Sequence, residues 1–236
     1  MNVAEKLPEL PLLDATSSPQ EIFRSGHEIA GAKVKLACSF SVEDVVIIDL
    51  LRDSLEDVSV FAIDTGRLNE ETYAIAEDVS QRYGVKIDWY FPQQSAVEQL
   101  SREKGLFSFR DSLDNRKQCC HIRKVEPLQR ALLGASAWMT GMRRAQGVTR
   151  NEQQALEIDH VNGGILKVNP LTFWSDDLLW TYAKEKRLPL NALYQQGYAS
   201  IGCAPCTRAV GAGESSRDGR WWWENAEHRE CGLHRR

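Results

Sequence analysis

Two pairs of cysteines have a spacing that suits metal chemistry. Cys119 and Cys120 are adjacent in KQCCHIRKVEPL, and Cys203 and Cys206 are separated by two residues in IGCAPCTR. Neighbouring side chains diverge on a strand and point about 100° apart on a helix, so an adjacent pair is a poor candidate for a relaxed disulfide. A two-residue gap lets two sulfurs converge on one centre. We therefore expect the four thiolates to share a metal centre.

An iron–sulfur cluster suits these residues better than zinc, which stays the main alternative. Structural zinc sites usually draw on two Cys-x-x-Cys pairs, and an adjacent pair is awkward at a small tetrahedral ion. A [4Fe-4S] cube is wider, but with four thiolates it carries negative charge that is costly to bury without compensation. Arg123 lies four residues after Cys119, and Lys124 four after Cys120, so on a helix each cation projects from roughly the face of its cysteine.

Cys231, near the C-terminus in HRECGLH, has a different environment. Its histidine and arginine neighbours lower the pKa of a thiol and raise its thiolate fraction. This pattern favours a nucleophile, with an incidental tail cysteine as the alternative. We interpret Cys38, at the end of a predicted strand, as a small packed apolar residue.

Candidate groups for binding an anion lie elsewhere in the chain. SFSVED (39–44) joins a predicted strand to a predicted helix, where backbone N–H groups and the helix dipole favour an anion. It lacks the Gly-rich, Lys-bearing form of a Walker loop, and a plain serine N-cap is the commoner explanation. Guanidinium groups fit phosphate and sulfate oxygens. The candidates, among which spacing cannot select, are Arg143, Arg144, Arg150, Arg217 and Arg220.

Strand and helix patterns alternate along the part of the chain that must position these residues. Ser17-Ser18-Pro19 begins a predicted helix through Ile29. Further predicted strands cover 33–40, 58–64, 85–91 and 136–141, and further predicted helices cover 42–53, 70–83 and 175–188. The alternation predicts a single α/β domain with a mostly parallel sheet flanked by helices. Ligands of such sheets bind beyond the carboxyl ends of the strands.

Composition changes mark the expected boundaries of this domain. We expect a loosely ordered, Pro- and Ser-rich segment over 1–19 and the α/β domain over 20–210. Residues 211–236, first rich in Gly, Ser and charge and then carrying three tryptophans, are expected to form a mobile tail with an anchor.

Size and charge bound the class of protein. The 236 residues, 42% of them apolar, can bury a core, and the formal net charge of −4 gives no indication of nucleic-acid or membrane-surface binding. The N-terminus lacks the features of a signal or transit peptide, and the apolar runs are far shorter than the ~20 residues that span a bilayer. We therefore expect a cytoplasmic protein whose six cysteines stay reduced.

Taken together, the motifs resemble one known family, the assimilatory adenylyl-sulfate (APS) reductases, close relatives of the phosphoadenylyl-sulfate (PAPS) reductases. SFSVED resembles the family's modified PP-loop, and DTGRLNEETY resembles its DTGRL segment. In the family's order follow KQCCHIRKVEPL, TGMRR, IGCAPCTR, GRWWWE and ECGLH, so that the likeness runs from about Lys33 to His234. The resemblance implies a PP-loop, adenine nucleotide alpha hydrolase-like fold.

The resemblance also implies roles for individual residues. Cys119, Cys120, Cys203 and Cys206 would ligate a [4Fe-4S] cluster, Cys231 would be the nucleophile, and Lys124 would link cluster and substrate. The residues that would hold the phosphosulfate are Arg217, Arg220 and His234, and those around the nucleotide are Ser39, Ser41, Gly141 and Arg150.

The reaction implied is reduction of APS to sulfite and AMP in sulfate assimilation, through an S-sulfocysteine on Cys231. PAPS-only relatives generally lack both cysteine pairs, so APS is favoured, with a PAPS or dual enzyme as the alternative. Plant-type relatives carry a fused redoxin domain, whereas this chain stops at Arg236, so thioredoxin or a similar dithiol protein is the expected reductant. A hinge at 211–219 and a Trp latch at 221–223 would let the tail close and open. A homo-oligomer is left open.

Two other classes of function predict different sequence features. A tRNA-modifying ATP-pyrophosphatase predicts an SGGxDS loop and a basic RNA-binding face, and the sequence has neither. A non-catalytic zinc-binding module predicts four sulfurs but gives no reason for Cys231.

Overall fold

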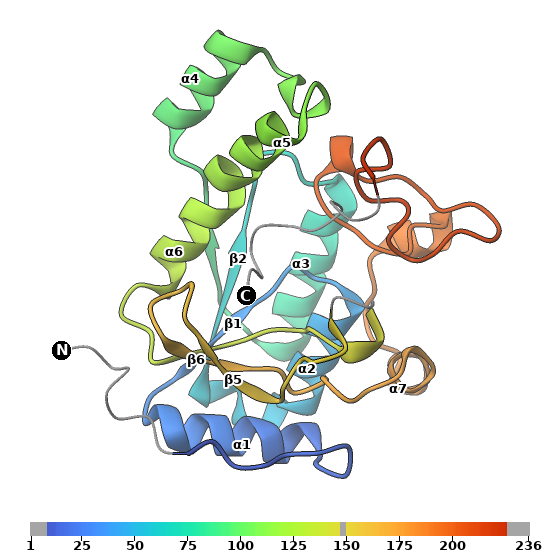
Figure 1. The fold of residues 1–236 in the computed structure, drawn as a ribbon. Coiled ribbons are helices and arrows are strands. Elements are labelled where there is room, and N and C mark those ends of the chain that lie inside the picture. The colour runs from blue at the N-terminus through green and yellow to red at the C-terminus, as the bar shows by residue number, and fades with distance from the viewer. Residues whose placement is uncertain (1–8, 147–149, 226–236) are drawn as a thin grey trace.

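A six-stranded sheet with helices on both faces forms the centre of the molecule (Figure 1). The computed structural model describes residues 9–146 and 150–225. The strands are β1 (Val34–Ala37), β2 (Val58–Ile63), β3 (Ile87–Tyr90), β4 (Ala137–Met139), β5 (Leu156–Asp159) and β6 (Ile165–Val168). Their order is β3-β2-β1-β4-β6-β5, and only β5 and β6 pair antiparallel. The predicted α/β class with a mostly parallel sheet is confirmed.

Helices connect these strands and pack on the sheet. They are α1 (Pro19–Ala30), α2 (Val42–Leu50), α3 (Glu70–Tyr83), α4 (Gln94–Lys104), α5 (Leu113–Cys120), α6 (Glu126–Leu132) and α7 (Asp176–Glu185). The predicted start of α1 is confirmed, because Ser18 caps it and forms a reciprocal capping box with Glu21. The predicted helix over 42–53 is too long: α2 ends at Leu50 and a 3₁₀ turn follows, in which Ser54 has a non-helical backbone. Asp and Ser, the residues at 53 and 54, are weaker helix formers than the apolar residues before them.

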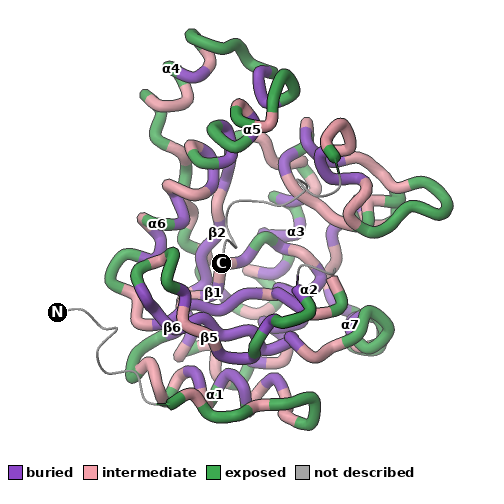
Figure 2. Tube along the Cα trace, in the orientation of Figure 1, coloured by how far each residue is buried: buried purple, intermediate pink, exposed green. Residues whose placement is uncertain are grey.

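Alternate residues of the strands supply two separate cores. On one face, Leu36, Val60 and Met139 pack in a cluster that includes buried residues of α1, α2, α3 and α7. On the other face, Phe61 and Trp138 pack with buried residues of α6. Successive strand side chains point to opposite faces, so a strand such as β4 contributes to both cores. Figure 2 shows the resulting buried centre beneath exposed helix surfaces.

A third buried cluster lies away from the sheet and contains three of the candidate metal ligands. Its members are Leu100, Phe109, Cys119, Cys203, Cys206 and Trp221. It joins α4 and α5 to the C-terminal loops, which are drawn in orange and red in Figure 1. The packing of these loops therefore depends on the residues around the cysteines.

Some predictions fall on residues outside the described ranges. Cys231 and His234 lie there, and the boundaries at 19 and 210 stay predictions. Within 9–146 and 150–225, no helix is both long enough and apolar enough to cross a membrane.

Candidate active site

A cavity of about 420 Å³, here called the strand-end cavity, lies beyond the carboxyl ends of the parallel strands. It lies where the strand order reverses: β2 pairs with one side of β1 and β4 with the other. Such switch points are the usual ligand sites of open α/β sheets. Its lining contains seven of the residues predicted to contact substrate, which are Ser39, Ser41, Lys124, Gly141, Arg150, Arg217 and Arg220. The fold therefore brings them together.

The loop between β1 and α2 forms a strained turn on one side of this cavity. Both the backbone N–H and the hydroxyl of Ser39 donate to Asp44 Oδ2, at 2.7 and 2.8 Å. Between them, buried Phe40 has a φ of 60°, a left-handed conformation that is costly for a residue with a Cβ. Burial raises the pKa of Asp44 to about 6, although the Ser39 hydrogen bonds act to lower it.

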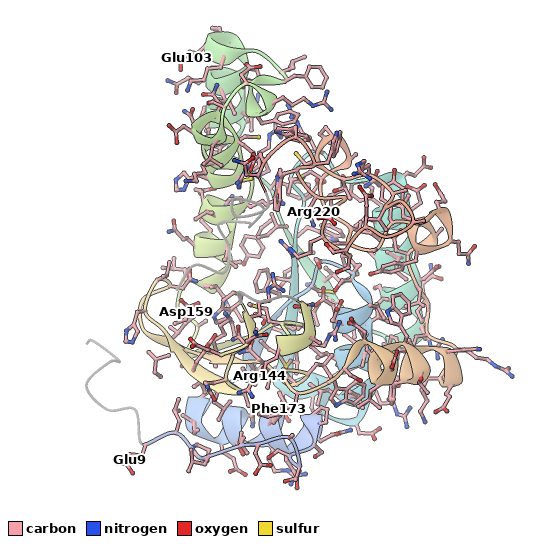
Figure 3. The ribbon with its side chains drawn as sticks, turned by 45° about the vertical axis from the view of Figure 1, so that its right-hand side comes forward. Glu9, Glu103, Arg144, Asp159, Phe173 and Arg220 are labelled. Atoms are coloured by element: carbon pink, nitrogen blue, oxygen red, sulfur yellow. The ribbon has the colours of Figure 1, made fainter. Side chains whose placement is uncertain are left out.

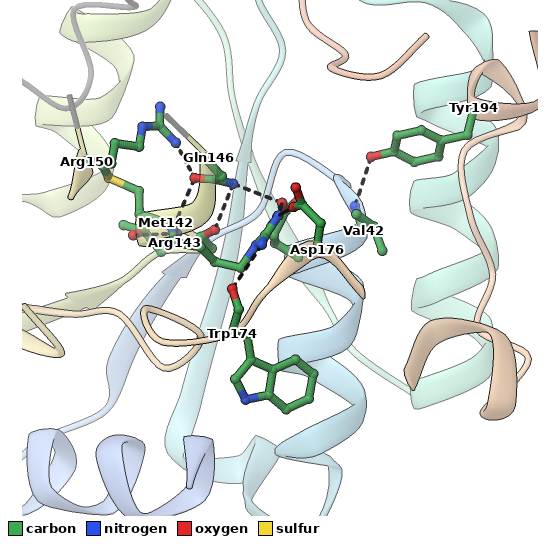
Figure 4. Close-up of polar contacts among 11 residues, drawn as sticks. Val42, Met142, Arg143, Gln146, Arg150, Trp174, Asp176 and Tyr194 are labelled. Atoms are coloured by element: carbon green, nitrogen blue, oxygen red, sulfur yellow. Dashed lines mark hydrogen bonds and ion pairs between the residues drawn. The ribbon is translucent and has the colours of Figure 1, made fainter. Parts of the chain in front are cut away.

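The first turn of α2 is not capped by its serine. Ser41 occupies the N-cap position, but its side chain makes no capping hydrogen bond. Instead the Val42 N–H donates to the Tyr194 hydroxyl at 3.0 Å (Figure 4). Capping therefore does not explain this serine, whose side chain belongs to the cavity lining.

Gly141, just after β4, allows the loop that follows this strand to touch the start of α2. A Cβ at this position would lie 2.7 Å from Glu43 Cβ and 2.8 Å from Asp44 Oδ1. Any side chain would therefore push the loop after β4 away from the start of α2.

A buried polar network extends from this contact (Figure 4). The Arg143 guanidinium, on a residue only 3% exposed, donates to Glu43 Oε1 at 2.9 Å and to Asp176 Oδ1 at 2.6 Å. The Gln146 amide donates to Glu43 Oε1 at 2.9 Å and accepts from Arg150. Arg143 is thus paired with carboxylates, and it holds the edge of the cavity in shape.

Arg144, another candidate for anion binding, turns away from the cavity. Its guanidinium lies 4.8 Å from the Phe173 ring centroid, and its Nε donates to the Gln153 carbonyl at 2.7 Å (Figure 3). It does not belong to the described lining of the strand-end cavity.

The four paired cysteines surround a second, small cavity, here called the cysteine cavity. Its other lining residues are Arg67, Phe109, Arg116, Arg123, Lys124 and Trp221. α5 supplies Cys119 and Cys120, whereas Cys206 ends a 3₁₀ turn over Ala204–Cys206 and Cys203 is the N-cap residue of that turn. All four are buried free thiols. Within the part of the chain that the structure describes, no group of three or more His, Cys, Asp or Glu side chains is arranged to hold a single metal ion.

The basic residues that follow Cys120 reach the cysteine cavity through a π-helical turn. α5 ends at Cys120, and His121–Val125 form a π-helix before α6. The α-helical register assumed from the sequence is therefore not kept, but Arg123 and Lys124 still line the cavity together with both cysteines. Single π turns inside helices are frequent at functional sites.

Several buried donors around the cysteine cavity have no acceptor among the described residues. They are Arg67 Nη1, Arg123 Nε and Trp221 Nε1, and Arg220 Nε is a fourth such donor nearby. A buried donor left without an acceptor costs roughly 1–3 kcal/mol. Three such donors around one cavity indicate that it is built for a group that accepts hydrogen bonds and carries negative charge.

The cysteine thiols differ in their acidity. Burial and the neighbouring Cys203 raise the pKa of Cys206 to about 12. Burial also acts to raise the pKa of Cys203, but Lys124, a hydrogen bond with Thr65 and the nearby arginines outweigh it and lower that pKa. The positive charges thus favour a thiolate at Cys203.

Lys124 and Cys203 line both cavities. The two sites are therefore in direct contact, with a buried cation at their boundary. The role expected for Lys124, between a cluster and a substrate, stays a prediction.

Sequence reasoning missed residues that come to the cysteine cavity from other segments. Thr65 accepts a hydrogen bond from the Cys203 thiol at 3.3 Å, and Arg67 lines the cavity. The sequence feature that could have identified both residues is DTGR at the carboxyl end of β2, where ligands of such sheets bind. Arg116, one turn before Cys120, gave no signal because a helical arginine is usually solvated.

Comparisons with known proteins place the chain in a family. The model of the phosphoadenosine phosphosulfate reductase domain matches residues 33–209. A protein of Allochromatium vinosum named adenosine 5'-phosphosulfate reductase is 48% identical over 203 residues, which are 86% of this chain and 79% of that protein. A protein of the same name from Pseudomonas aeruginosa is 44% identical over 97% of this chain and 86% of its own length.

A plant protein and two proteins of known structure extend the comparison. 5'-adenylylsulfate reductase 3 of Arabidopsis thaliana, described as chloroplastic, is 42% identical over 98% of this chain but only 52% of its own length. The crystal structure of phosphoadenylyl-sulfate (PAPS) reductase from Candida auris, a phosphate complex, has a TM-score of 0.67 and 29% identity, over 83% of this chain and 91% of that one. Candida glabrata FMN adenylyltransferase shares the fold, with a TM-score of 0.53 and 15% identity.

These matches agree with the motifs on which the resemblance was based. The family model covers β1 through the second cysteine pair, and close relatives extend the likeness across most of the chain. The chain belongs to the phosphoadenosine phosphosulfate reductase family, whose members include the enzymes named adenosine 5'-phosphosulfate reductase.

Proposed function

We propose that this protein is an oxidoreductase that reduces adenosine 5'-phosphosulfate to sulfite and AMP in sulfate assimilation. The observation that carries the proposal is the boundary at Lys124, where a nucleotide-sized cavity at the sheet switch point meets a cavity lined by four cysteines. The relatives named adenosine 5'-phosphosulfate reductase support the same substrate.

The strand-end cavity supplies the groups that an adenylyl phosphosulfate needs. Ser39, Ser41, Gly141 and Arg150 would surround the nucleotide. Lys124, Arg217, Arg220 and His234 would hold the phosphosulfate, because cations stabilise the charge that develops on the leaving phosphate. Except for His234, these residues line one cavity.

The cysteine cavity fits a [4Fe-4S] cluster held by Cys119, Cys120, Cys203 and Cys206. Its buried donors without acceptors and its basic lining suit a negatively charged sulfur-rich group, whose sulfurs accept N–H hydrogen bonds. When bound, the cluster would supply a fixed negative charge beside the cationic residues proposed to bind the substrate. Zinc stays the alternative, since it takes the same thiolate ligands.

In the proposed reaction, the Cys231 thiolate attacks the sulfur of the bound phosphosulfate. A bond forms between the cysteine sulfur and the sulfonate sulfur, the bond from that sulfur to the phosphate oxygen breaks, and AMP leaves with the electron pair. Lys124, Arg217 and Arg220 would stabilise the negative charge that develops on the phosphate oxygen.

Release of sulfite needs two electrons from a partner. A dithiol protein of the thioredoxin type attacks the S-sulfocysteine, sulfite leaves, and the partner's second thiol resolves the mixed disulfide. We place the reaction in the cytoplasm, where such dithiols are kept reduced.

The substrate is tested by comparing APS with PAPS in an anaerobic assay of sulfite release with a reduced dithiol protein. We expect APS to support release at least tenfold faster than PAPS at equal concentration, and the Cys231→Ser variant to release no sulfite. A protein that turns over PAPS preferentially would support the alternative substrate, and one inactive with both would contradict the proposed reaction.

The cofactor is tested through two matched serine variants of buried cysteines. Cys203→Ser should purify with little iron and acid-labile sulfide, because one of four ligands is lost. Cys38→Ser changes a buried cysteine that lines only the strand-end cavity, and should keep the wild-type iron content. Equal iron content in both variants, or zinc in the wild type, would contradict a cluster at the cysteine cavity.

A further inference from the structure

A buried ion pair ties the helix of the first cysteine pair to the chain that leads to Cys231. Arg116 Nε donates to Glu224 Oε1 at 3.0 Å, and Arg116 Nη2 donates to Glu224 Oε2 at 2.9 Å. The two side chains are only 2% and 8% exposed. Two parallel hydrogen bonds between a guanidinium and a carboxylate fix orientation as well as distance. Arg116 lies on α5 four residues before Cys120, and Glu224 precedes Cys231 by seven residues.

The second cysteine pair is attached to the same short stretch by backbone bonds. The Trp221 N–H donates to the Cys206 carbonyl at 3.1 Å, and Thr207 forms a β-bridge with Arg220. Two guanidinium groups lie close to the Trp221 ring, that of Arg116 at 4.8 Å and that of Arg220 at 4.6 Å from its centroid. Trp221 has a φ of 43°, a strained conformation that persists only where the surroundings enforce it. Residues 220–224 are therefore fastened to both cysteine pairs.

We propose that the Arg116–Glu224 pair is a positioning device that couples the state of the cysteine site to the placement of the chain carrying the nucleophile. Filling the cysteine cavity orders α5 and the Cys203–Cys206 turn, and these hold residues 220–224. By thermodynamic reciprocity, fastening residues 220–224 stabilises the filled site to the same extent. The coupling rests on the proposed cofactor and on the proposed role of Cys231.

The position of Glu224 also limits where Cys231 can act. Seven extended residues span at most about 25 Å, so the anchor at Glu224 sets the region that the thiolate can reach. A buried ion pair is by itself weak evidence for stability, because desolvation offsets much of its attraction. Removing one partner of a buried pair destabilises its surroundings in any case. The coupling is therefore tested by the rate at which the cysteine site loses iron, which a purely structural pair would leave unchanged.

The test compares Glu224→Gln with a matched control in the same segment, Glu214→Gln. Glu214 also forms a two-bond pair with an arginine, Arg208, but that pair is about one-third exposed and is not part of the cysteine cavity. The readouts are the rate of iron loss to a chelator under anaerobic conditions and hydrogen–deuterium exchange of peptides covering 220–225. Both use the full-length protein without substrate.

We expect E224Q to lose iron at least fivefold faster than wild type and to exchange faster at 220–225, whereas E214Q behaves as wild type. Removing iron from the wild type should speed exchange at 220–225 in the same way. Arg116→Lys keeps the charge but loses the two-bond geometry, so its rates of iron loss and of exchange should lie between those of E224Q and wild type. This variant serves as the test if E224Q does not fold.

Faster exchange in E224Q with an unchanged rate of iron loss would overturn the coupling, as would equal effects of E224Q and E214Q. A wild-type protein that purifies without iron would also overturn the coupling, because the coupling requires the proposed cluster. Failure of the sulfite assay alone would not change these rates, so it would remove the proposed role of Cys231 but leave the link between the cysteine site and residues 220–224 in place.

Discussion

Lys124 shows at the scale of one residue how the two cavities depend on each other. It is only 9% exposed and lines both of them. A buried ammonium is costly unless negative charge lies close by. Thiolates or a cluster in the cysteine cavity and an anionic substrate in the strand-end cavity would provide that charge. A negative group in either cavity therefore helps to keep Lys124 charged for the other.

Asp44 leads to a prediction about pH. Burial raises its pKa from 3.8 to about 6, so the folded protein binds a proton more tightly than the unfolded chain. Below the unfolded pKa the carboxyl is protonated in both states and does not alter the free energy of unfolding. As pH rises from the unfolded pKa to the folded pKa, ionisation of the unfolded chain lowers the free energy of unfolding. A shift of this size corresponds to about 3 kcal/mol. We expect the stability of the wild type relative to Asp44→Asn to fall as pH rises from about 4 to 6.

Urea unfolding of both proteins at several pH values in this range measures the difference. A stability difference that stays constant with pH would show that Asp44 does not titrate as its burial implies.

At the scale of elements, the sequence predicted the strands and helices whose signals are local. α3 and the capped start of α1 were predicted correctly, because apolar spacing and capping residues act within a few positions. The π turn after Cys120 and the pairing of Arg116 on α5 with Glu224 were not predicted, since they depend on contacts between distant segments. The meeting of the four cysteines at one cavity could be predicted from their types and spacing, whereas the positions of Arg67 and Arg116 at that cavity required the fold.

A buried carboxylate joins three helices behind the site and gives an element-scale prediction. Asp49 of α2 accepts from the Tyr83 hydroxyl of α3 at 3.0 Å and from the Tyr182 hydroxyl of α7 at 2.7 Å. Because hydrogen bonds to charged groups contribute roughly 1.5–3 kcal/mol, Tyr182→Phe should lower the free energy of unfolding by about that amount. Denaturant unfolding measures this loss.

A double-mutant comparison isolates the pair. In an Asp49→Asn background, where the carboxylate charge is gone, Tyr182→Phe should cost clearly less than in the wild type. Equal costs in the two backgrounds would mean that the tyrosine stabilises the helices by packing alone.

At the scale of the whole molecule, the topology decides where the chemistry can occur. The switch between β2 and β4 on either side of β1 opens the strand-end cavity, and the loops after β1, β2 and β4 carry Ser39, Thr65 and Gly141 to it. The segment from α4 to the π turn and the C-terminal loops then close the cysteine cavity beside it. The fold thus places the strand-end cavity, where the anionic substrate is proposed to bind, in contact with the cavity of the four proposed cluster ligands.

Mass spectrometry of the anaerobically purified protein, after incubation with APS and no reductant, tests this reaction most directly. We predict that the protein gains one SO₃ group, that proteolytic peptides place it on Cys231, and that one AMP is released for each adduct. Addition of a reduced dithiol protein should remove the group as sulfite. A protein that converts APS to AMP and sulfite without any adduct on Cys231, or that forms the adduct on another cysteine, would contradict the proposed mechanism.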